Sequence, residues 1–255
     1  MKRLILAAAL VLGLATPAAA EPTMITVRAI SKDSKFIGTS MGGVEVRLYE
    51  GYGEKLLAEG RIEGATGDTD LLMTTPLVRR APMATRGDAA FVAVLDIDKP
   101  TLVRLEATGP NKSPGAAAIQ VTSMAWFLPG RGTTGDGWVV EFPGLAIQPV
   151  FAFLGKDHSK TKTGQISADV TLMCGCPLEP GGFWDSNKVE VIAWIAADGQ
   201  PPRQVRLAYG GKPSFFTAEV GDLPANFTIT VTAYDLRSGN TGVANMIPIR
   251  PPPKR

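Results

Sequence analysis

The sequence contains very little histidine and cysteine: one histidine, His158, and two cysteines, Cys174 and Cys176, among 255 residues. A single histidine excludes a histidine-rich metal site, and no base stands beside a nucleophile as catalysis would require. Without Lys2 and Arg3 the 26 basic residues fall to 24, which equals the 24 acidic ones. A neutral surface with no basic cluster argues against nucleic acid as a partner. We therefore expect a protein that is not an enzyme and binds no nucleic acid.

Long apolar runs are also absent. The stretch at residues 4–15 is too short to span a bilayer, which takes about 20 residues. It follows two basic residues and precedes three alanines at 18–20, which together are the three parts of a secretory signal peptide. We predict that residues 1–20 are removed on export. The mature protein would begin at Glu21, carry no transmembrane anchor and be periplasmic or secreted.

Glycine and proline are plentiful, with 28 and 20 residues, as in turn-rich β proteins. In segment 43–49, Val and Leu at every second position alternate with charged residues, which is the period of a half-buried strand. The expected fold class is therefore all-β, built from β-sandwiches. Strands of this kind are expected at residues 23–30, 43–49, 89–97, 101–107, 119–127, 138–142, 168–173, 188–196, 204–209, 214–220 and 226–233.

The strands divide into two series around a polar stretch, residues 155–164, which is almost free of apolar side chains. We interpret this stretch as a linker between two tandem domains. The first β-sandwich domain would then cover residues 21–154 and the second residues 165–250. The proline-rich end, residues 251–255, is expected to be a flexible tail.

Two resemblances to known families follow from these strands. The opening strands, Gly43-Val-Glu-Val-Arg-Leu-Tyr49 and Leu56-Leu-Ala-Glu-Gly60, resemble those of transthyretin-like (carboxypeptidase regulatory-like) sandwiches. The second domain, which ends in Phe227-Thr-Ile-Thr-Val-Thr-Ala-Tyr-Asp235, resembles a bacterial immunoglobulin-like sandwich. The resemblances imply β-sandwich folds and no particular function, because both folds have many functions. The second domain has no cysteine in its last strands, so the cross-sheet disulfide of antibody domains is absent.

The most chemically distinctive segment is Met173-Cys-Gly-Cys-Pro177. An oxidising compartment favours a local disulfide between Cys174 and Cys176, and Gly175 permits the tight turn that this needs. A second interpretation is a soft-metal site, in which the two thiolates and the Met173 thioether suit copper as Cu(I). A third is a covalent bond to a partner or cofactor, and a fourth is a pair of inert buried thiols. We treat Cys174, Cys176 and Met173 as the redox or metal candidates.

Tryptophan residues raise the question of ligand stacking. Trp126 and Trp194 fall in alternating strands, where core packing is the expectation. Only Trp184, within Phe183-Trp184-Asp185, follows a glycine pair and is expected in a loop. These three residues are the candidates for an exposed binding loop.

One segment matches the residue pattern of a catalytic motif. Gly38-Thr-Ser-Met-Gly42 matches the G-x-S-x-G pattern, in which a nucleophilic serine stands between a strand and a helix. Here a strand is expected directly afterwards, and His158 lies in the predicted linker. We interpret the motif as a glycine-rich loop, with Ser40 as an ordinary loop residue.

Taken together, these observations favour a non-catalytic periplasmic protein that binds another exported or membrane protein as an accessory or assembly factor. The main alternative is a periplasmic protein that handles copper or thiols through Cys174 and Cys176. A more distant alternative is a glycan-binding module.

Overall fold

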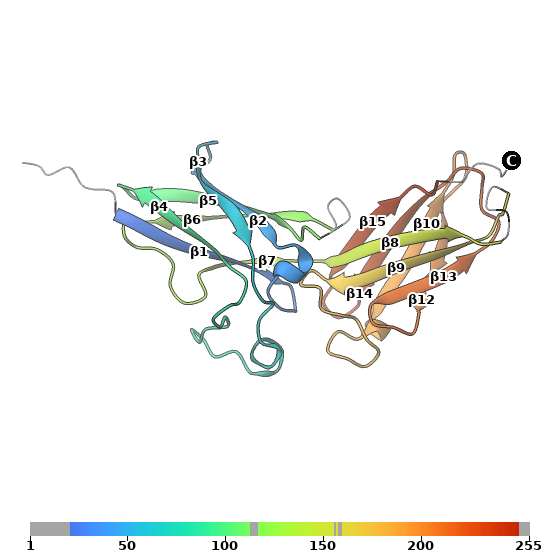
Figure 1. Cartoon of the computed structure of the whole chain (residues 1–255), viewed down its shortest axis with the longest axis horizontal. Coiled ribbons are helices and arrows are strands. Elements are labelled where there is room, and N and C mark those ends of the chain that lie inside the picture. The colour runs from blue at the N-terminus through green and yellow to red at the C-terminus, as the bar shows by residue number, and fades with distance from the viewer. Residues whose placement is uncertain (1–20, 113–116, 156, 158–159, 250–255) are drawn as a thin grey trace, which may run out of the picture.

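The computed structural model describes residues 21–112, 117–155, 157 and 160–249. The predicted signal peptide, His158 and the predicted tail lie outside these residues. The chain is all-β, as the sequence predicts: within the described residues fifteen strands form four sheets, and the helical elements are short single turns. Two β-sandwiches follow one another along the chain and lie end to end (Figure 1).

The first sandwich packs a three-stranded sheet against a four-stranded sheet. In the smaller sheet β1 is antiparallel to β4 and parallel to β7. In the larger sheet all neighbours are antiparallel. The smaller sheet has the order β4 (Phe91–Ile97), β1 (Glu21–Ser31), β7 (Trp138–Phe142), and the larger has the order β3 (Leu56–Ile62), β2 (Val44–Glu50), β5 (Thr101–Gly109), β6 (Ile119–Phe127).

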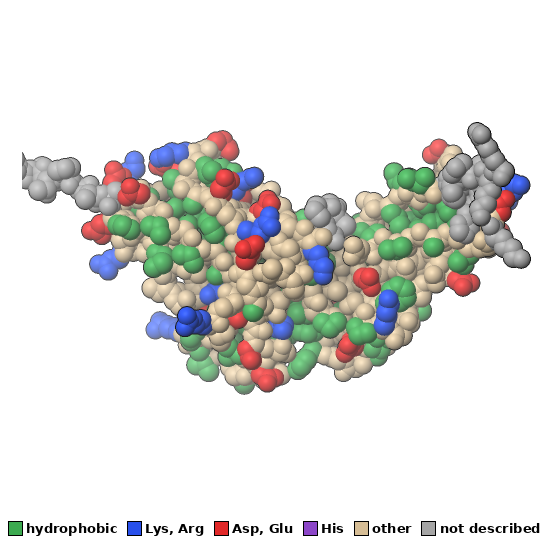
Figure 2. Space-filling view, viewed as in Figure 1, with side chains coloured by type: hydrophobic (Ala, Val, Ile, Leu, Met, Phe, Trp, Pro, Cys, Tyr) green, Lys and Arg blue, Asp and Glu red, His purple; other side chains and the backbone are tan. Residues whose placement is uncertain are grey.

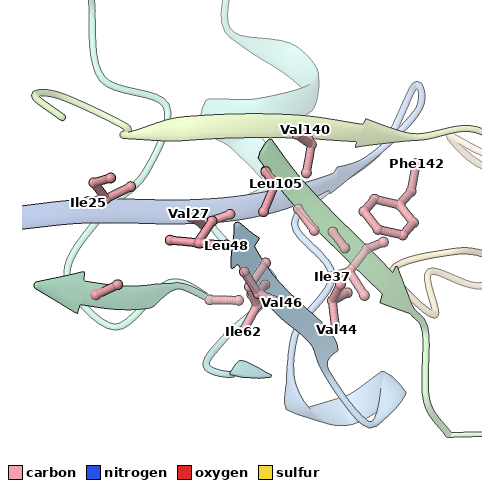
Figure 3. Close-up of a cluster of buried hydrophobic side chains, with 14 of the residues drawn as sticks. Ile25, Val27, Ile37, Val44, Val46, Leu48, Ile62, Leu105, Val140 and Phe142 are labelled. Carbon is pink, nitrogen blue, oxygen red and sulfur yellow. The ribbon is translucent and has the colours of Figure 1, made fainter. Parts of the chain in front are cut away.

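Apolar side chains at alternate positions of the strands form the core of the first sandwich. Every second side chain of β5 is buried, and Leu105 of β5 pairs with Leu48 of β2 in the sheet register. Ile25 and Val27 of β1 approach from the other sheet (Figure 3). Full burial of a Val, Leu or Ile side chain contributes roughly 1.5–3 kcal/mol. A one-residue slip would turn this whole set toward water, so burial fixes the register.

The second sandwich packs two four-stranded antiparallel sheets around a separate core. In one of its two sheets the longest pairing is between β10 and β14. Val191, Ala193 and Val231 of these strands are buried. One sheet has the order β12 (Ala208–Tyr209), β13 (Phe215–Val220), β9 (Gly164–Leu172), β8 (Leu145–Phe153), and the other has the order β11 (Arg203–Arg206), β10 (Val189–Ala196), β14 (Thr228–Asp235), β15 (Thr241–Met246).

The position of residues 155–164 differs from the linker expected there. They follow β8 and lead into β9, and these two strands pair along their whole length, from Leu145 with Leu172 to Phe153 with Gly164. Leu145 and Ile147 of β8 belong to the core of the second sandwich. The chain therefore passes from one core to the other near Gly144, between β7 and β8, because the apolar residues of β8 are buried with the later strands.

Charge is distributed evenly over the visible surface. In the face shown in Figure 2, acidic and basic side chains are interspersed, with no broad patch of either sign. The ion pairs that the structure shows, such as Arg47–Glu59 and Arg206–Glu190, lie on exposed strand faces. Pairs of this kind contribute little to stability, roughly 0–1 kcal/mol each. Burial of the two cores, rather than charge, stabilises the fold.

Candidate functional site

The two sandwiches meet at the turn that follows β1. The Lys32 ammonium group donates a hydrogen bond to the Ser238 carbonyl (2.9 Å), and the Lys32 carbonyl accepts one from the Asn240 side chain (3.2 Å). The Asn240 side chain is buried, and its oxygen accepts from the Gly144 backbone N–H (2.9 Å). One asparagine thus joins the first turn, the crossing point of the chain and the loop before β15.

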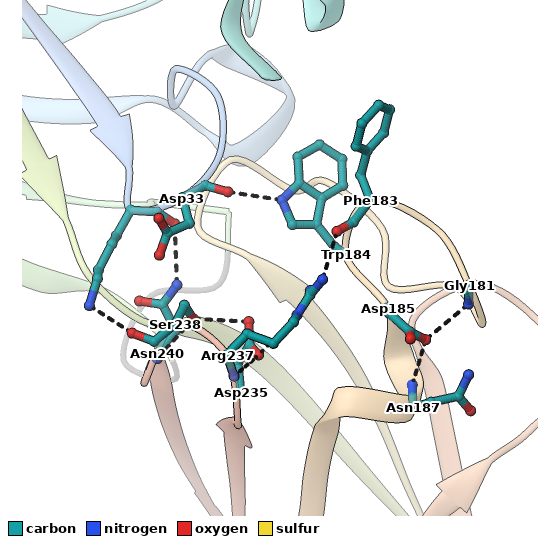
Figure 4. A network of polar contacts seen from close by, with 11 residues as sticks. Asp33, Gly181, Phe183, Trp184, Asp185, Asn187, Asp235, Arg237, Ser238 and Asn240 are labelled. Atoms are coloured by element: carbon teal, nitrogen blue, oxygen red, sulfur yellow. Dashed lines mark hydrogen bonds and ion pairs between the residues drawn. The ribbon is translucent and has the colours of Figure 1, made fainter. Parts of the chain in front are cut away.

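The next two residues of the same turn contact two other loops of the second sandwich. Asp33 has a left-handed backbone (φ 55°), a conformation that aspartate tolerates better than most residues. Its carbonyl accepts a hydrogen bond from the indole Nε1–H of Trp184 (3.0 Å; Figure 4). The buried Ser34 hydroxyl lies 3.0 Å from the Cys174 sulfur. The first sandwich is therefore held at the junction by contacts to three separate loops of the second sandwich.

A groove opens at this junction, with a cavity of about 270 Å³. This volume is slightly below the range of typical small-molecule pockets, roughly 300–1,000 Å³. The Phe183 side chain is 55% exposed at its rim, whereas Trp184 is half-buried. The lining includes Asp33, Met73, Phe183, Trp184, Arg237 and Ser238. We call it the junction groove.

Asp185 holds the loop and does not line the groove. Its carboxylate accepts hydrogen bonds from the backbone N–H groups of Gly181 (2.9 Å) and Asn187 (3.0 Å). These two bonds hold the pKa of Asp185 below its ordinary value, because they stabilise the charged form. Asp185 also caps the short 3₁₀ turn at Ser186–Lys188. Of the three predicted loop residues, Phe183 and Trp184 face the groove and Asp185 fixes their backbone.

Arg237 ties the same loop to the neighbouring one. Its guanidinium donates to the Phe183 carbonyl (3.2 Å) and lies 3.6 Å from the Asp235 carboxylate. Asp235 is buried and also accepts from the Ser238 hydroxyl and the Arg237 backbone N–H, both at 2.9 Å. Figure 4 shows this network running from Ser238 to the Phe183 loop. The sequence does not single out these two residues. Asp235 ends a strand, and Arg237 looks like an ordinary turn residue.

The cysteine pair lies on the second-sandwich side of the same junction. The Cα atoms of Cys174 and Cys176 are 5.5 Å apart and their sulfurs are at disulfide distance, within the usual range of Cα separations for a bridge. Both residues are buried, at 1% and 5% exposure. Met173 is also buried, and its side chain belongs to the first core, with its methyl group beside Gly144. The pair therefore belongs to the core of the second sandwich, where that core faces the junction, and does not lie on an exposed turn.

Trp126 contradicts the core packing expected for it. Its side chain is 68% exposed on the outer face of β6. Trp194 also lies on an outer face, partly buried, where its Nε1–H donates to the Thr232 hydroxyl (3.1 Å). Strand alternation shows that a residue belongs to one face, but it does not show which face is turned to the core when both carry apolar residues.

Ser40 does not form a nucleophile elbow. It lies exposed in a 3₁₀ turn, Thr39–Met41, and β2 follows directly, so the strand–serine–helix arrangement is missing. In the described part of the chain, no three histidine, cysteine, aspartate or glutamate side chains are grouped as metal ligands would be. Within that same part, no helix is long and apolar enough to cross a membrane.

Comparison with known proteins gives no family for this chain. No protein-family model matches it, and no curated protein sequence is similar to it. The transthyretin-like and immunoglobulin-like resemblances therefore stay predictions. What the structure establishes is an all-β chain with a groove between two sandwiches.

Proposed function

We propose that the protein is a non-catalytic, exported binding protein that recognises another exported or membrane protein through the junction groove. The observation that carries this proposal is the exposed Phe183 ring on a backbone that is held rigidly. Aromatic side chains that fill a partner's pocket provide much of the energy of protein interfaces. A loop that is already ordered loses less entropy on binding, which favours affinity.

Three contacts supply that order. Arg237 holds the Phe183 carbonyl, Asp185 holds both ends of the loop, and Trp184 is anchored on Asp33 of the other sandwich. The Phe183 and Trp184 rings also lie together, with centroids 6.1 Å apart. The ring of Phe183 remains exposed beside the groove, although the residues around it are fixed. This combination suits recognition of an apolar side chain on a partner protein.

Photocrosslinking in the producing cell tests the proposal. A photoreactive phenylalanine analogue is placed at position 183 and, as the matched control, at Tyr52, which is 82% exposed and does not line the groove. We expect one discrete adduct from position 183, identified by mass spectrometry as an exported or membrane protein, and none from position 52. The same set of adducts from both positions would contradict the proposal, because it would show contact without a specific surface.

A second candidate function, glycan binding, is favoured by Trp126. An exposed indole offers a flat apolar face, on which sugar rings stack. Arg104 lies in the neighbouring strand, over the Tyr49 ring at 4.7 Å from its centroid, and Leu102 pairs with Trp126 in the register. Binding to a panel of oligosaccharides by the wild type and by Trp126→Ala tests this idea. A glycan bound equally by both proteins, or by neither, would remove it.

A further inference from the structure

The strand β6 forms one edge of the larger sheet of the first sandwich. It pairs with β5 over all nine of its residues. Among the described residues, no strand pairs with it on the other side. The N–H and C=O groups along such an edge form a template to which another strand can add.

The other sheet edges in the described part of the chain differ from β6. Soluble proteins protect edge strands with charged side chains, proline, bulges or short length. The strands β3, β4, β7 and β11 contain charged residues, β8 contains Pro149, and β12 has only two residues. In β15, Gly242 lies against the Leu145 carbonyl of β8, so that edge is partly covered. The edge at β6 has none of these protections.

The sequence of β6 favours strand pairing. It reads Ile119-Gln-Val-Thr-Ser-Met-Ala-Trp-Phe127 and contains no charged residue, proline or glycine, although 20% of the whole chain is charged. Segments of this composition pair readily with other strands. The inward side chains of Ile119, Val121 and Ala125 are only partly buried against the first core. A strand added at this edge would therefore also complete the burial of core-facing side chains.

We propose that β6 pairs antiparallel with β6 of a second copy of this chain, about a two-fold axis at Ser123, the central residue of the strand. The pairing joins the larger sheets of the two copies into one continuous sheet. Two-fold dimers are the commonest oligomers of soluble proteins, and in them the same surface is used by both copies. A surface of this kind must be complementary to itself, and β6 meets this condition in side-chain size and in charge.

Side-chain size differs between the two halves of β6. On the outer face, Gln120 and Thr122 come first, and the larger apolar Met124 and Trp126 follow. Antiparallel pairing about Ser123 places Gln120 opposite the second copy's Trp126 and Thr122 opposite the second copy's Met124. Each large apolar side chain therefore lies opposite a smaller polar one. On the inner face, the same register places Val121 opposite the second copy's Ala125.

The charges beside β6 do not oppose this pairing. The nearest ones on the outer face are Arg104 and Glu106 of β5, which pair in the register with Met124 and Thr122. Arg104 and Glu106 form an ion pair with each other at 3.1 Å, so they largely neutralise one another. Like charges on directly opposite residues would destabilise a sheet, and β6 itself brings none. A second copy can therefore approach this edge without repulsion.

Sedimentation equilibrium of the full mature chain, over a range of concentrations, tests the proposal. We expect a dimer for the wild type, and Thr122→Lys should raise its dissociation constant about tenfold or more, because a charge on an edge strand opposes pairing. The new lysine would lie beside Glu106 of its own chain, which the fold tolerates. Thr241→Lys is the matched control, an exposed threonine on the edge strand β15, and should dimerise as the wild type does. Circular dichroism melts establish that both variants are folded.

Disulfide cross-linking tests the register without relying on Thr122→Lys. Directly opposite residues have Cβ atoms roughly 4.5–5.5 Å apart and diagonal ones roughly 7–8 Å apart, whereas a disulfide needs roughly 3.5–4.5 Å. Under mild oxidation, a mixture of Thr122→Cys and Met124→Cys proteins should form cross-linked dimers, and neither protein alone should do so.

Three results would overturn the proposal. A wild type that is monomeric at every concentration would show that no second copy covers β6, and that the edge is open or receives a strand of another protein. Equal dissociation constants for folded Thr122→Lys and Thr241→Lys would place the dimer contact elsewhere. Cross-links that form as well in Thr122→Cys alone as in the mixture, or in neither, would exclude the register about Ser123.

Discussion

Two of the three loops by which the second sandwich contacts the first sandwich differ in burial. In the turn at residues 173–177, Cys174 and Cys176 are almost inaccessible members of the core of the second sandwich, and Met41 packs against Gly175. The loop at residues 179–187 lies on the rim, and its Phe183 ring is mostly exposed. The buried turn contacts Met41 and Ser34 of the first sandwich, whereas the rim loop leaves its Phe183 ring exposed.

Two glycine substitutions test this difference in burial. One of them, Gly175→Ala, has the largest expected effect on the free energy of unfolding. Gly175 and Gly181 both have left-handed backbones, with φ of 80° and 72°. A Cβ at 175 meets the Met41 sulfur, whereas a Cβ at 181 meets nothing within 4 Å. Backbone strain costs about 1 kcal/mol in each variant, and overpacking adds about 2 kcal/mol only at 175. We expect Gly175→Ala to lose about 3 kcal/mol and Gly181→Ala about 1 kcal/mol in denaturant unfolding.

Equal losses in these two variants would contradict the close packing of Met41 on Gly175. The combined variant Met41→Ala/Gly175→Ala provides a further control. If the clash is the cause, Gly175→Ala should cost less free energy of unfolding in the Met41→Ala background than in the wild type, because the shortened side chain relieves the contact. The two changes would then be coupled and not additive.

Removal of the cysteine pair should have a moderate effect on stability. A bridge between residues two apart closes a very small loop, so its contribution lies near the low end of the roughly 0–5 kcal/mol range. In Cys174→Ala/Cys176→Ala the buried Ser34 hydroxyl also loses its sulfur neighbour, which costs about 1 kcal/mol. We expect a total loss of about 2 kcal/mol in the oxidised protein. Ser34→Ala alone, measured in parallel, isolates the contribution of the hydroxyl.

The rim loop should respond to acid through Asp185. The pKa of this group is lowered in the folded protein, chiefly by the Gly181 N–H. Its contribution to stability is therefore present above the pKa of an unfolded aspartate, about 3.9, and is lost as the pH falls through the lower folded value. The difference in Tm between wild type and Asp185→Asn should narrow from about pH 6 to about pH 2. The exposed Asp198→Asn serves as the control, and an equal narrowing there would contradict this role of Asp185.

The smallest effect on stability is expected at Phe183. Because the ring is largely exposed, Phe183→Ala should change the free energy of unfolding by no more than about 0.5 kcal/mol. A loss above about 2 kcal/mol would show that the ring is part of the core packing. The side chain would then be unavailable to a partner.

Most strands could be predicted from the sequence, because alternation records burial directly. The residues of β6 and β7 were predicted to the last position, at 119–127 and 138–142. The sequence does not indicate β8, because Pro149 interrupts its apolar run. The structure shows that β8 lies at the edge of its sheet, where a missing N–H is tolerated. Without β8, the polar residues 155–164 looked like a linker.

The candidate site was only partly visible in the sequence. Cys174, Cys176 and the loop at 183–185 stand out by residue type and by the glycines around them. Met41, Ser34 and Arg237 do not, because each reaches the junction from another loop, and Met41 and Ser34 come from the other sandwich. A single sequence carries no signal for contacts between distant segments whose residues are common types.

The measurement that tests the proposed function most directly involves both the Phe183 loop and the cysteine turn. Photocrosslinking from position 183 is repeated in the Cys174→Ser/Cys176→Ser protein, after a melt has shown that this protein is folded. The Phe183 loop is held by Arg237 and Asp185 and not by the cysteine turn. We therefore predict the same discrete adduct as in the wild-type background. Loss of the adduct from the folded variant would contradict the proposed function and would place recognition at the cysteines instead.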